Sequence, residues 1–321
     1  MLVIGIESSA HTFGVGIVSD SKILANEKEM YPIKDKGMIP SKVAMFHIKN
    51  FSKVIKRALE KANIKIRDID GISYTMGPGM GPSLQVGELV AKTLAKELKV
   101  PIVPVNHAMG HIEIAKHFGN LNDPIALYVS GGNSQIIKKF ENRYRVIGET
   151  LDIGIGNLFD NFAREAKLVP AWGSTVAKLA EKGKFIEMPY TVKGMDFAFT
   201  GLLTYSKKLI GKVPLEDICF SLQETAFSMV CEATERALLL TNTKELCVCG
   251  GVAQSKRLKE MLSKIAKENN IKFGYAPDEY NADNGAMIAY VGEKLLKCGI
   301  SKNVEECSIK QRYRIEDAII C

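Results

Sequence analysis

The two halves of this 321-residue chain repeat one order of sequence patterns, and that repetition narrows the folds open to it more than any single motif. Each half opens with three short apolar runs separated by small polar turns, which is typical of a three-strand meander. The predicted strands are residues 2–6, 14–18 and 23–25 in the first half, and 125–129, 134–138 and 144–147 in the second. The repetition predicts an α/β protein of two related subdomains, residues 1–120 and residues 121–321, the second with inserted helices.

A strand, a glycine-rich loop and a helix then follow in both halves. The strands are residues 71–74 and 246–249, the loops are Gly77–Pro82 and Gly250–Ala253, and the helices are predicted over 83–98 and 255–268. A third glycine pair, Gly131 and Gly132, lies in the first turn of the second half. Backbone N–H groups in such loops can surround phosphate oxygens at a helix N-terminus, so three loops in a duplicated frame favour nucleotide binding. No Gly-Lys-Ser/Thr follows them, which excludes a Walker loop; the alternative is that the glycines serve only tight turns.

Two of the five histidines, His107 and His111, stand four residues apart after the apolar run 101–105, which reads as a buried strand. Residues i and i+4 share one face of a helix, so two imidazoles at this spacing can bind one metal ion. The helical protease signature places a glutamate after the first histidine, and here that residue is Ala108. Glu113 would point elsewhere on the helix. The pair can therefore coordinate without a protease base, or it is simply two histidines of a core or surface helix.

The matching junction in the second half carries Asp283. If the halves pack with pseudo-two-fold symmetry, this carboxylate approaches His107 and His111, and two imidazoles with one carboxylate suit a divalent metal. Tyr128, at the end of the strand that opens the second half, could reach the same place. The alternative for Asp283 is a helix N-cap before Asn284 and Gly285, although capping and ligation can coexist.

A glycine-containing patch, Asp152–Phe162, lies in the middle of the second half. On a helix that starts near Asn157, Asp160 sits in the first turn, where it accepts hydrogen bonds from a ribose or interacts with the helix dipole. A later stretch, Met195–Leu202, reads as an ordered turn anchored by aromatic residues.

Composition limits the classes of protein that remain. No apolar run reaches the length of a membrane span, and the N-terminus enters a strand without a basic leader, so we expect a cytoplasmic protein with no membrane partner. Seven cysteines without framework spacing fit a reducing compartment, and Cys247 and Cys249 suit core packing. The net charge of +7 permits a phosphate-rich partner, bound by folded patches rather than by a stacking platform. The basic clusters are Lys53, Lys56 and Arg57; Lys256, Arg257 and Lys259; and Lys310, Arg312 and Arg314.

Together these motifs resemble one family, the tRNA N6-adenosine threonylcarbamoyltransferases, formerly called O-sialoglycoprotein endopeptidases. The resemblance spans nearly the whole chain in the right order, and Gly110–Ile114 is closer to the archaeal and eukaryotic branch, which works within the KEOPS complex. The motifs that carry it are Glu7-Ser8-Ser9, Gly77–Ser83, Asn106–Glu113, Tyr128–Asn133, Asp152–Asn157, Asp196–Leu202, Gly250–Ala253 and Asp283–Met287.

The resemblance implies a duplicated actin-like and hexokinase-like fold (ASKHA) with two subdomains around a nucleotide- and metal-binding cleft. It implies transfer of threonylcarbamoyl from threonylcarbamoyl-adenylate to N6 of the adenine 3′ of the anticodon, in tRNAs that read codons beginning with A. It implies one divalent metal ion, Fe²⁺ or alternatively Zn²⁺, and the partners tRNA, a small kinase and accessory subunits of a KEOPS-type complex. The metal ligands it implies are His107, His111, Tyr128 and Asp283, the two histidines being catalytic. The substrate-binding residues it implies are Tyr128, Val129, Ser130, Gly131, Gly132, Asp160 and Gly173, with the positions of Ala177 and Ser255.

Three positions depart from the family pattern. Ala177 stands where the family has a glutamate that contacts the nucleotide ribose, Ser255 where it has an asparagine, and Gln85 where an arginine is common. Each lost buried hydrogen bond near the nucleotide weakens binding by about 1–3 kcal/mol. The departures therefore bear on nucleotide affinity more than on the metal site.

Three other functions compete with the transferase. A kinase of the same fold would need a carboxylate base such as Glu7 and a Mg²⁺–phosphate site, where two histidines are unexpected. A metalloprotease lacks the glutamate after His107. A nucleic-acid-binding or abasic-site-cleaving protein fits the net charge, but no DNA-reading motif is present.

Overall fold

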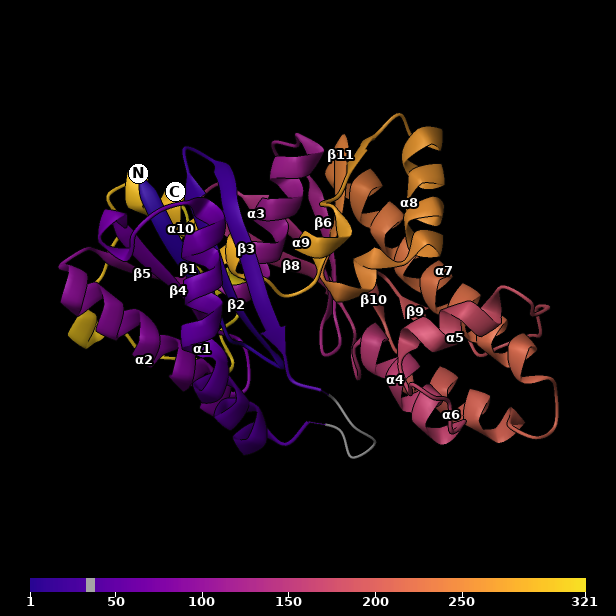
Figure 1. The fold of residues 1–321 in the computed structure, drawn as a ribbon. Coiled ribbons are helices and arrows are strands. Elements are labelled where there is room, and N and C mark those ends of the chain that lie inside the picture. Colours follow the sequence, from indigo (N-terminus) through magenta and orange to yellow (C-terminus); the bar gives the residue numbers. More distant parts are fainter. Residues whose placement is uncertain (33–37) are drawn as a thin grey trace. The chain divides into compact units, whose positions relative to one another are not determined.

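Two five-stranded mixed sheets organise the chain, which the computed structural model describes over residues 1–32 and 38–321 (Figure 1). The chain divides into two compact units that interleave in sequence. The first unit comprises Met1–His117, Phe140–Tyr144 and Ala276–Cys321, and the second comprises Phe118–Lys139 and Arg145–Tyr275. The division predicted at residue 120 assigned residues 276–321 to the second half, whereas this segment packs in the first unit.

The sheet of the first unit has the strand order β3-β2-β1-β4-β5. Strands β1, β2 and β3 form the predicted antiparallel meander, while β4 and β5 run parallel to β1. The parallel strands are buried along almost their whole length, as strands covered on both faces must be. The bounds are β1 Leu2–Glu7, β2 Thr12–Ser19, β3 Lys22–Met30, β4 Gly71–Gly77 and β5 Ile102–Asn106.

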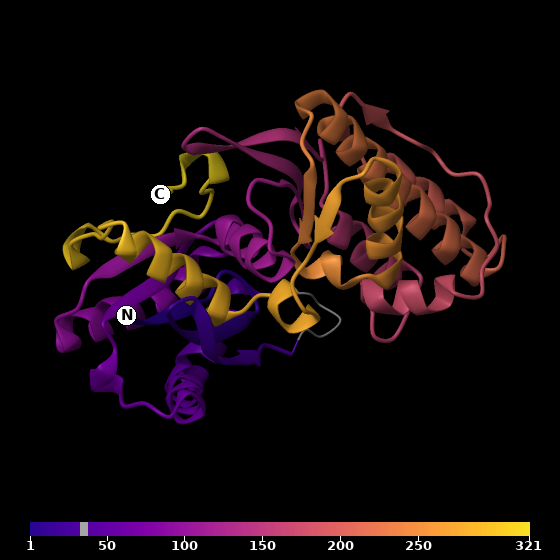
Figure 2. The ribbon, with the colours of Figure 1, turned by 90° about the horizontal axis from the view of Figure 1, so that it is seen from above.

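Helices cover both faces of this sheet. Alternate residues of β1 point to opposite faces, so Ile4 and Ile6 enter the apolar core shared with α1 and α2, while Gly5 faces α10. In Figure 2 the yellow helix α10 lies alongside the indigo strands of the sheet. The helices of this unit are α1 Pro40–Ala62, α2 Gly81–Leu98, α3 His107–Gly119, α9 Asp278–Asn281 and α10 Gly285–Lys297, with the short 3₁₀ turns η1 Ile66–Asp68, η3 Val304–Glu306 and η4 Ile315–Asp317.

Glycines bring the backbone of α10 onto the sheet. A Cβ atom at Gly5 would lie 2.1 Å from the backbone nitrogen of Ala289, and one at Gly16 would lie 2.2 Å from that of Ala286. Neither methyl group could be accommodated without moving the helix. These two glycines therefore fix how closely the start of α10 approaches β1 and β2.

The sheet of the second unit has the order β12-β11-β6-β7-β8, with β6 parallel to β11 and antiparallel to β7. Its core joins the sheet to the helices α4, α5, α6, α7 and α8, which Figure 1 labels in the same unit. The strands are β6 Ile125–Val129, β7 Ser134–Phe140, β8 Arg143–Glu149, β11 Glu245–Cys249 and β12 Lys272–Gly274, with a small ribbon of β9 Val192–Lys193 and β10 Asp196–Phe197. The helices are α4 Ile155–Glu165, α5 Gly173–Ala180, α6 Thr200–Leu209, α7 Leu215–Thr241 and α8 Lys256–Glu268, with η2 Gly251–Gln254.

The repeated order of elements predicted from the sequence is confirmed, since each sheet contains a strand meander and a parallel pair joined through helices. Helix α2 begins at Gly81, two residues before the predicted start, and α4 begins at Ile155, so Asp160 lies in its second turn instead of its first. Among the described residues, no helix combines the length and the apolar character that crossing a bilayer requires.

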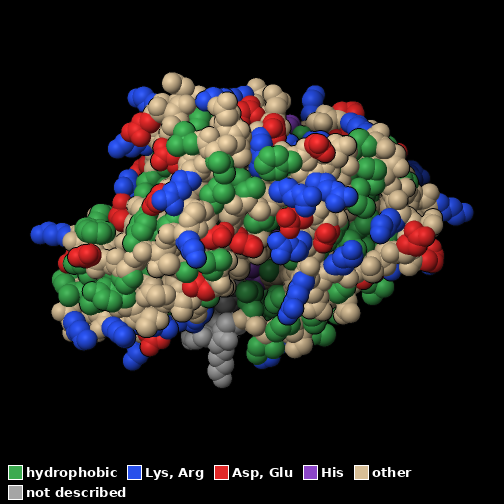
Figure 3. Space-filling view, turned by 180° about the vertical axis from the view of Figure 1, so that it is seen from behind, with side chains coloured by type: hydrophobic (Ala, Val, Ile, Leu, Met, Phe, Trp, Pro, Cys, Tyr) green, Lys and Arg blue, Asp and Glu red, His purple; other side chains and the backbone are tan. Residues whose placement is uncertain are grey.

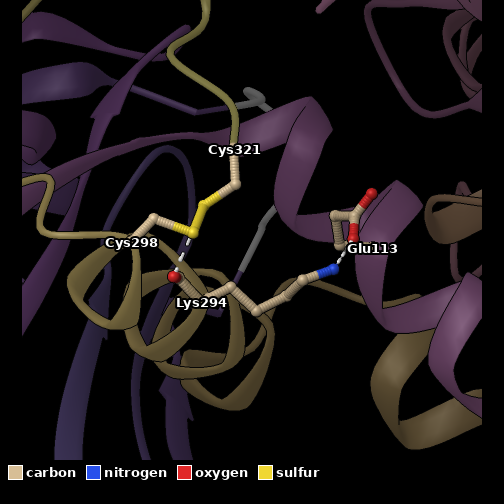
Figure 4. The surroundings of a disulfide bond; sticks show 4 residues. All are labelled: Glu113, Lys294, Cys298 and Cys321. Carbon is tan, nitrogen blue, oxygen red and sulfur yellow. Dashed lines mark hydrogen bonds and ion pairs between the residues drawn. A yellow bond between two sulfur atoms is a disulfide. The ribbon is translucent and has the colours of Figure 1, made fainter.

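Cysteines divide into two groups. Five are free and buried, including Cys247 and Cys249 in β11, as the core-packing interpretation expected. The other two, Cys298 and Cys321, form a disulfide that the sequence did not indicate (Figure 4). Cys298 follows the last turn of α10, so the bridge ties residue 321 to the end of that helix.

Candidate metal centre and substrate loops

The predicted histidine pair lies at the carboxyl edge of the first sheet. Strands β1, β4 and β5 are parallel, so their carboxyl ends share one edge, where α/β proteins place ligands. Helix α3 starts at His107, directly after β5 ends at Asn106. The Asn106 side chain accepts a hydrogen bond from the Met109 amide at 3.2 Å and so satisfies one N–H group of the first turn. This junction sets the direction in which both histidines project.

His107, His111 and Asp283 come together as a group of potential metal ligands. Nε2 of His107 lies 3.2 Å from Nε2 of His111. Oδ1 of Asp283 lies 3.5 Å from the first of these atoms and 3.4 Å from the second. All three residues belong to the first unit, so Asp283 approaches the histidines as expected, but from within the same unit and not from an opposite half of the chain as the predicted symmetry required.

The spacing of these three atoms fits a metal ion. The centre of a regular tetrahedron with edges of this length lies about 2.0–2.1 Å from each corner, which is the usual bond length for zinc with imidazole or carboxylate ligands. Two histidines and one carboxylate on one face also form the facial triad that binds Fe²⁺. The donor set therefore suits a divalent transition metal and leaves further coordination positions open.

Asp283 is available for this role because its neighbour caps the helix. The side chain of Asn284 accepts a hydrogen bond from the Met287 amide at 3.0 Å and is the N-cap of α10. The alternative in which Asp283 itself caps the helix is therefore wrong. Because α10 is pressed against Gly5 and Gly16, the residue just before it is held at the edge of the sheet beside α3.

A buried carboxylate orients the first histidine. Oε2 of Glu7 lies 3.0 Å from Nδ1 of His107 and accepts a 2.6 Å hydrogen bond from the Thr75 hydroxyl. Oε1 of Glu7 accepts a 2.6 Å hydrogen bond from the Ser9 amide. Burial raises the pKa of Glu7, but the His107 charge and hydrogen bond outweigh it, and the net shift is downward. With Nδ1 donating to Glu7, Nε2 of His107 presents its lone pair to the other ligands.

Electrostatics keep the other two ligands in their metal-binding forms. Burial lowers the pKa of His111, which favours the neutral imidazole. Burial would raise the pKa of the Asp283 carboxyl, but hydrogen bonds and charges from the two histidines hold it well below its usual range. A neutral imidazole and an ionised carboxylate are the species that coordinate a metal.

Glu113 points away from the histidine pair, as the sequence predicted. Its carboxylate accepts hydrogen bonds from the Tyr144 hydroxyl at 2.5 Å, from Lys116 at 2.7 Å and from Lys294 at 2.5 Å (Figure 4). Burial raises the pKa of Glu113, but the two lysines outweigh it and lower the pKa to about 2. Glu113 is therefore a fixed anion that holds α3 to α10, and it is not a base for the site.

Two polar groups of the site were missed from the sequence. One is Glu7, the partner of His107. A prediction that β1, β4 and β5 are parallel neighbours in the sheet would have placed these two residues together. The other is Lys28 on β3, whose Nζ lies 3.5 Å from the backbone oxygen of Asp283. Burial lowers the pKa of Lys28, while Asp283 opposes that shift. No motif marks Lys28, because it lies on the last strand of the β1–β3 meander, far from the histidines in sequence.

The glycine loop before α2 packs against protein instead of opening to a ligand. A Cβ atom at Gly77 would lie 1.8 Å from the Lys310 carbonyl oxygen, and one at Gly79 would lie 2.5 Å from that of Ser9. A Cβ atom at Gly81 would lie 2.3 Å from the Gln311 side chain. In this loop the glycines therefore serve close packing. Nucleotide binding remains a prediction for the two glycine loops of the second unit.

In the second unit, the loop after β6 is bound to the start of α4. The Gly156 amide donates to the Ser130 carbonyl at 3.1 Å, and the Asn157 amide donates to the Gly131 carbonyl at 2.9 Å. A Cβ atom at Gly132 or Gly251 would meet no atom within 4 Å, so both loops expose backbone. Tyr128 and Val129 end β6 and are buried in this unit. The roles of Tyr128 as a ligand and of Tyr128–Gly132 in substrate binding remain predictions.

The other substrate-binding candidates of this unit occupy ordered positions. Oδ1 of Asp160 accepts a 2.9 Å hydrogen bond from the Gly173 amide, so these two residues, predicted separately, lie together. Ala177 is half-buried on α5, one turn after Gly173. Ser255 accepts a hydrogen bond from the Leu258 amide and is the N-cap of α8. The hydroxyl of Ser255 therefore has a structural role, whatever its part in binding.

Asp152 connects two of the sequence motifs. Its carboxylate accepts hydrogen bonds from the amides of Phe199 and Thr200, at 2.9 and 2.8 Å, where α6 begins. Burial raises the pKa of Asp152, but these backbone donors outweigh it and the net shift is downward. Asp152 therefore anchors the Met195–Leu202 turn beside α4.

Comparison with known proteins follows the same motifs. A family profile described as tRNA N6-adenosine threonylcarbamoyltransferase matches residues 21–290. The chain is 48% identical over 320 residues to a protein of that name from Thermococcus sibiricus, covering 99% of this chain and 98% of the relative. It is also 48% identical to a probable bifunctional tRNA threonylcarbamoyladenosine biosynthesis protein from Thermoplasma volcanium, covering 99% of this chain and 60% of that protein.

Solved structures agree on the fold. HypF from T. kodakarensis superposes with a TM-score of 0.65 at 17% identity, over 92% of this chain and 48% of HypF. The activator of 2-hydroxyisocaproyl-CoA dehydratase from Clostridium difficile, with bound ADPNP, superposes with a TM-score of 0.52 at 12% identity, over 94% of this chain and 99% of the activator. These similarities place the chain in the duplicated actin-like (ASKHA) fold class.

Proposed function

The chain belongs to the tRNA N6-adenosine threonylcarbamoyltransferase family, and from that premise we propose that His107, His111 and Asp283 hold its divalent metal ion. The observation that carries the proposal is the triangle of Nε2, Nε2 and Oδ1 atoms with edges of 3.2 to 3.5 Å. We propose Fe²⁺ as the ion, because two histidines and a carboxylate form its facial triad, with Zn²⁺ as the alternative. Tyr128 is the proposed fourth ligand.

Both the attacking amine and the threonylcarbamoyl group must be activated or positioned for the transfer. The exocyclic amine of adenine is a poor nucleophile because its lone pair is delocalised into the ring. In the transfer, N6 bonds to the carbamoyl carbon, the bond to the phosphate oxygen breaks, AMP leaves and the amine loses one proton. A metal held at this site supplies Lewis-acid polarisation of the threonylcarbamoyl group. The protein contributes mainly positioning, because Glu7 fixes the orientation of His107 and the buried strands fix Glu7.

The exposed glycine loops of the second unit are the proposed site of the adenylate. Gly131 and Gly132 offer backbone N–H groups to phosphate oxygens, and Asp160, bound to the Gly173 amide, is placed to accept hydrogen bonds from a ribose. Ala177 and Ser255 supply less to this site than the residues usual in the family. We therefore expect correct binding geometry with reduced affinity.

Partner proteins are also part of the proposal. The Thermoplasma relatives, of which this chain covers 60%, are described as probable bifunctional tRNA threonylcarbamoyladenosine biosynthesis proteins, which supports a link between the transferase and a second activity. We propose that a small kinase supplies this second activity and that accessory subunits complete a KEOPS-type complex. The site of action proposed is the cytoplasm, where the tRNA substrate is found.

The competing functions fit the site poorly. A kinase would need a free carboxylate base, and Glu7 is fully buried and bound to His107, Thr75 and Ser9. A metalloprotease would need a glutamate near the metal, and Glu113 is bound to two lysines. Full-length relatives carry the transferase name, which also disfavours a protein that only binds nucleic acid.

Reconstitution tests the proposal. Purified protein, threonylcarbamoyl-adenylate, tRNA and the expected partner subunits are combined, and the tRNA is digested for nucleoside mass analysis. The wild type is expected to form threonylcarbamoyl-adenosine, while His111→Ala forms none and binds no stoichiometric metal. His117→Ala, on the same helix but outside the ligand group, serves as the matched control. Product formation by metal-free His111→Ala would contradict the assigned site.

A further inference from the structure

The only tryptophan of the chain, Trp172, lies on the surface of the second unit. It is 43% exposed, and its neighbour Val169 is 91% exposed, in the connection between α4 and α5. Large apolar side chains in a loop are normally turned inward, because exposure forfeits the free energy of burial. Trp172 and Val169, three residues apart in one connection, are therefore candidates for a binding surface.

The connection that carries Trp172 is held in place by hydrogen bonds. The Leu168 amide donates to the Ala163 carbonyl at 2.9 Å, which closes the end of α4. The Trp172 amide and the Thr175 hydroxyl both donate to the Pro170 carbonyl, at 2.9 and 2.7 Å. The backbone that presents the indole ring is thus ordered, and little conformational entropy remains to be lost when a ligand binds it.

The part of the sequence that contains this connection is rich in positive charge. Residues 164–213 contain nine lysines and arginines against four acidic residues, so most of the net charge of +7 lies in this stretch. Between residues 161 and 180 the single acidic side chain is Glu165, which pairs with Lys207 on α6 at 3.2 Å. Figure 1 shows α4, α5 and α6 close together within the second unit.

Three exposed cations stand close to Trp172 in the sequence: Arg164 on α4, Lys167 in the connection and Lys178 on α5. Arg164 donates a hydrogen bond to Asn161, and within the described parts of the chain neither lysine has an ion-pair partner. On the face that Figure 3 draws, lysines and arginines are spread over the surface with hydrophobic side chains between them. Unneutralised cations beside an exposed aromatic ring match a ligand that offers both phosphates and flat bases.

We propose that Trp172 with Arg164, Lys167 and Lys178 forms a tRNA-binding surface, in which the indole stacks on an unpaired base and the cations bind neighbouring phosphates. Single-stranded loops are the parts of RNA whose bases can stack on aromatic side chains, and such stacking combines with a cationic track for the backbone. The inference rests on the proposed function for its choice of tRNA as the nucleic acid. It also revises the expectation from the sequence that no stacking platform is present.

Fluorescence gives a direct test, because Trp172 is the only tryptophan. Substrate tRNA is titrated into the full-length protein, and binding is followed both by indole emission and by electrophoretic mobility. Stacking is expected to quench the emission. Trp172→Ala should weaken tRNA binding about tenfold, the usual cost of losing one stacked base, while Trp172→Phe retains most of the affinity. Matched substitution of another exposed ring, Phe140→Ala, should change nothing.

The cations are tested by salt dependence. Lys178→Glu should weaken binding and make the plot of log affinity against log salt concentration shallower by about one unit. Lys264→Glu, an equally exposed lysine on α8, is the control and should leave that slope unchanged. In the reconstituted modification assay, Trp172→Ala should raise the KM for tRNA and leave kcat and metal content as in the wild type.

Three results would overturn the inference. The first is equal tRNA affinity of the wild type and Trp172→Ala. The second is quenching by AMP alone as complete as that by tRNA, which would assign the ring to the adenylate. The third is loss of a partner subunit from Trp172→Ala with tRNA affinity unchanged, which would make the surface a protein interface. Wild-type protein that binds tRNA through Trp172 but forms no product would instead count against the proposed reaction.

Discussion

Nδ1 of His107 lies 3.0 Å from Oε2 of Glu7, although 100 residues separate them in the chain. The contact arises because Glu7 ends β1 and His107 follows β5, and both strands run parallel to β4, which lies between them. Thr75 on β4 completes the bridge by donating its hydroxyl hydrogen to the same carboxylate oxygen. One sheet edge therefore sets the tautomer of His107, a proposed metal ligand.

Glu7→Gln should weaken metal binding about 10- to 100-fold, the usual effect of losing the carboxylate partner of a ligating histidine. The amide keeps the size of the side chain, so thermal stability of the metal-free protein should change much less than the affinity. Competition with a chromophoric chelator measures the affinity, and Glu29→Gln on β3, whose carboxylate pairs with Lys53 and Arg57, is the control. Unchanged affinity in Glu7→Gln would show that Glu7 does not orient His107.

Gly16→Ala should weaken metal binding from a distance. The added methyl group would lie 2.2 Å from the backbone nitrogen of Ala286, so α10 must move and take Asp283 with it. Overpacking of this kind costs about 1–3 kcal/mol of stability. Urea unfolding and chelator competition should both respond. Gly201→Ala, where a Cβ atom meets nothing within 4 Å, should change neither, and equal behaviour of the two variants would refute the argument.

His47 should make the protein sensitive to mild acid. It is fully buried on α1, and burial lowers its pKa from 6.5 to about 4. The unfolded chain therefore takes up a proton below pH 6.5 that the folded chain refuses until about pH 4. Stability present above pH 6.5 is lost as the pH falls through this window, by about 3 kcal/mol in all. Urea unfolding at several pH values should show this loss, and His47→Gln should show a correspondingly shallower one.

Ala177→Glu should tighten binding of the adenylate. The residue lies on α5 one turn after Gly173, and a carboxylate there would add a hydrogen-bond acceptor near Asp160. A buried hydrogen bond regained at this position is worth about 1–3 kcal/mol. Calorimetric titration with a non-hydrolysable adenylate analogue measures the change. Ser174→Glu places the same charge on an exposed position of the helix, and an equal gain there would reduce the effect to general electrostatics.

Removing the Cys298–Cys321 bridge should lower stability. The bridge closes a loop with a sequence separation of 23 residues, and in the chain-entropy model a loop of this length is worth about 3 kcal/mol. Cys321→Ser and reductant-treated wild type should unfold at the same, lower urea concentration, with the metal affinity retained. If the urea concentration at which the wild type unfolds is the same with and without reductant, the disulfide does not stabilise the fold.

The sequence predicted the parts of the site that depend on local spacing. His107 and His111 share a helix face because of their four-residue separation, and the junction after β5 was recognisable from its apolar run. The repeated order of elements predicted that Asp283 approaches the histidines, but it assigned Asp283 to the wrong half of the chain. The partnership of Glu7 was not predicted, because it depends on which strands neighbour each other in the sheet.

Loop composition was a weaker guide. Gly77, Gly79 and Gly81 look like a phosphate loop, yet each makes room for the segment around Lys310 or for the turn after β1. That segment lies more than two hundred residues later in the chain, so no local pattern could reveal the contact. The exposed position of Trp172 was equally hidden, since a tryptophan is normally expected in a core.

Because residues 276–321 belong to the first unit, the residues of the proposed metal site are synthesised at different times. During synthesis the strands that carry Glu7 and the helix that carries His107 and His111 leave the ribosome first, and domains begin to fold as they emerge. Asp283 appears only after the whole of the second unit has been made. A nascent chain therefore holds two histidines and their orienting carboxylate while the third ligand is still missing. Completion of the proposed metal site therefore depends on the segment that follows the second unit and returns to the first.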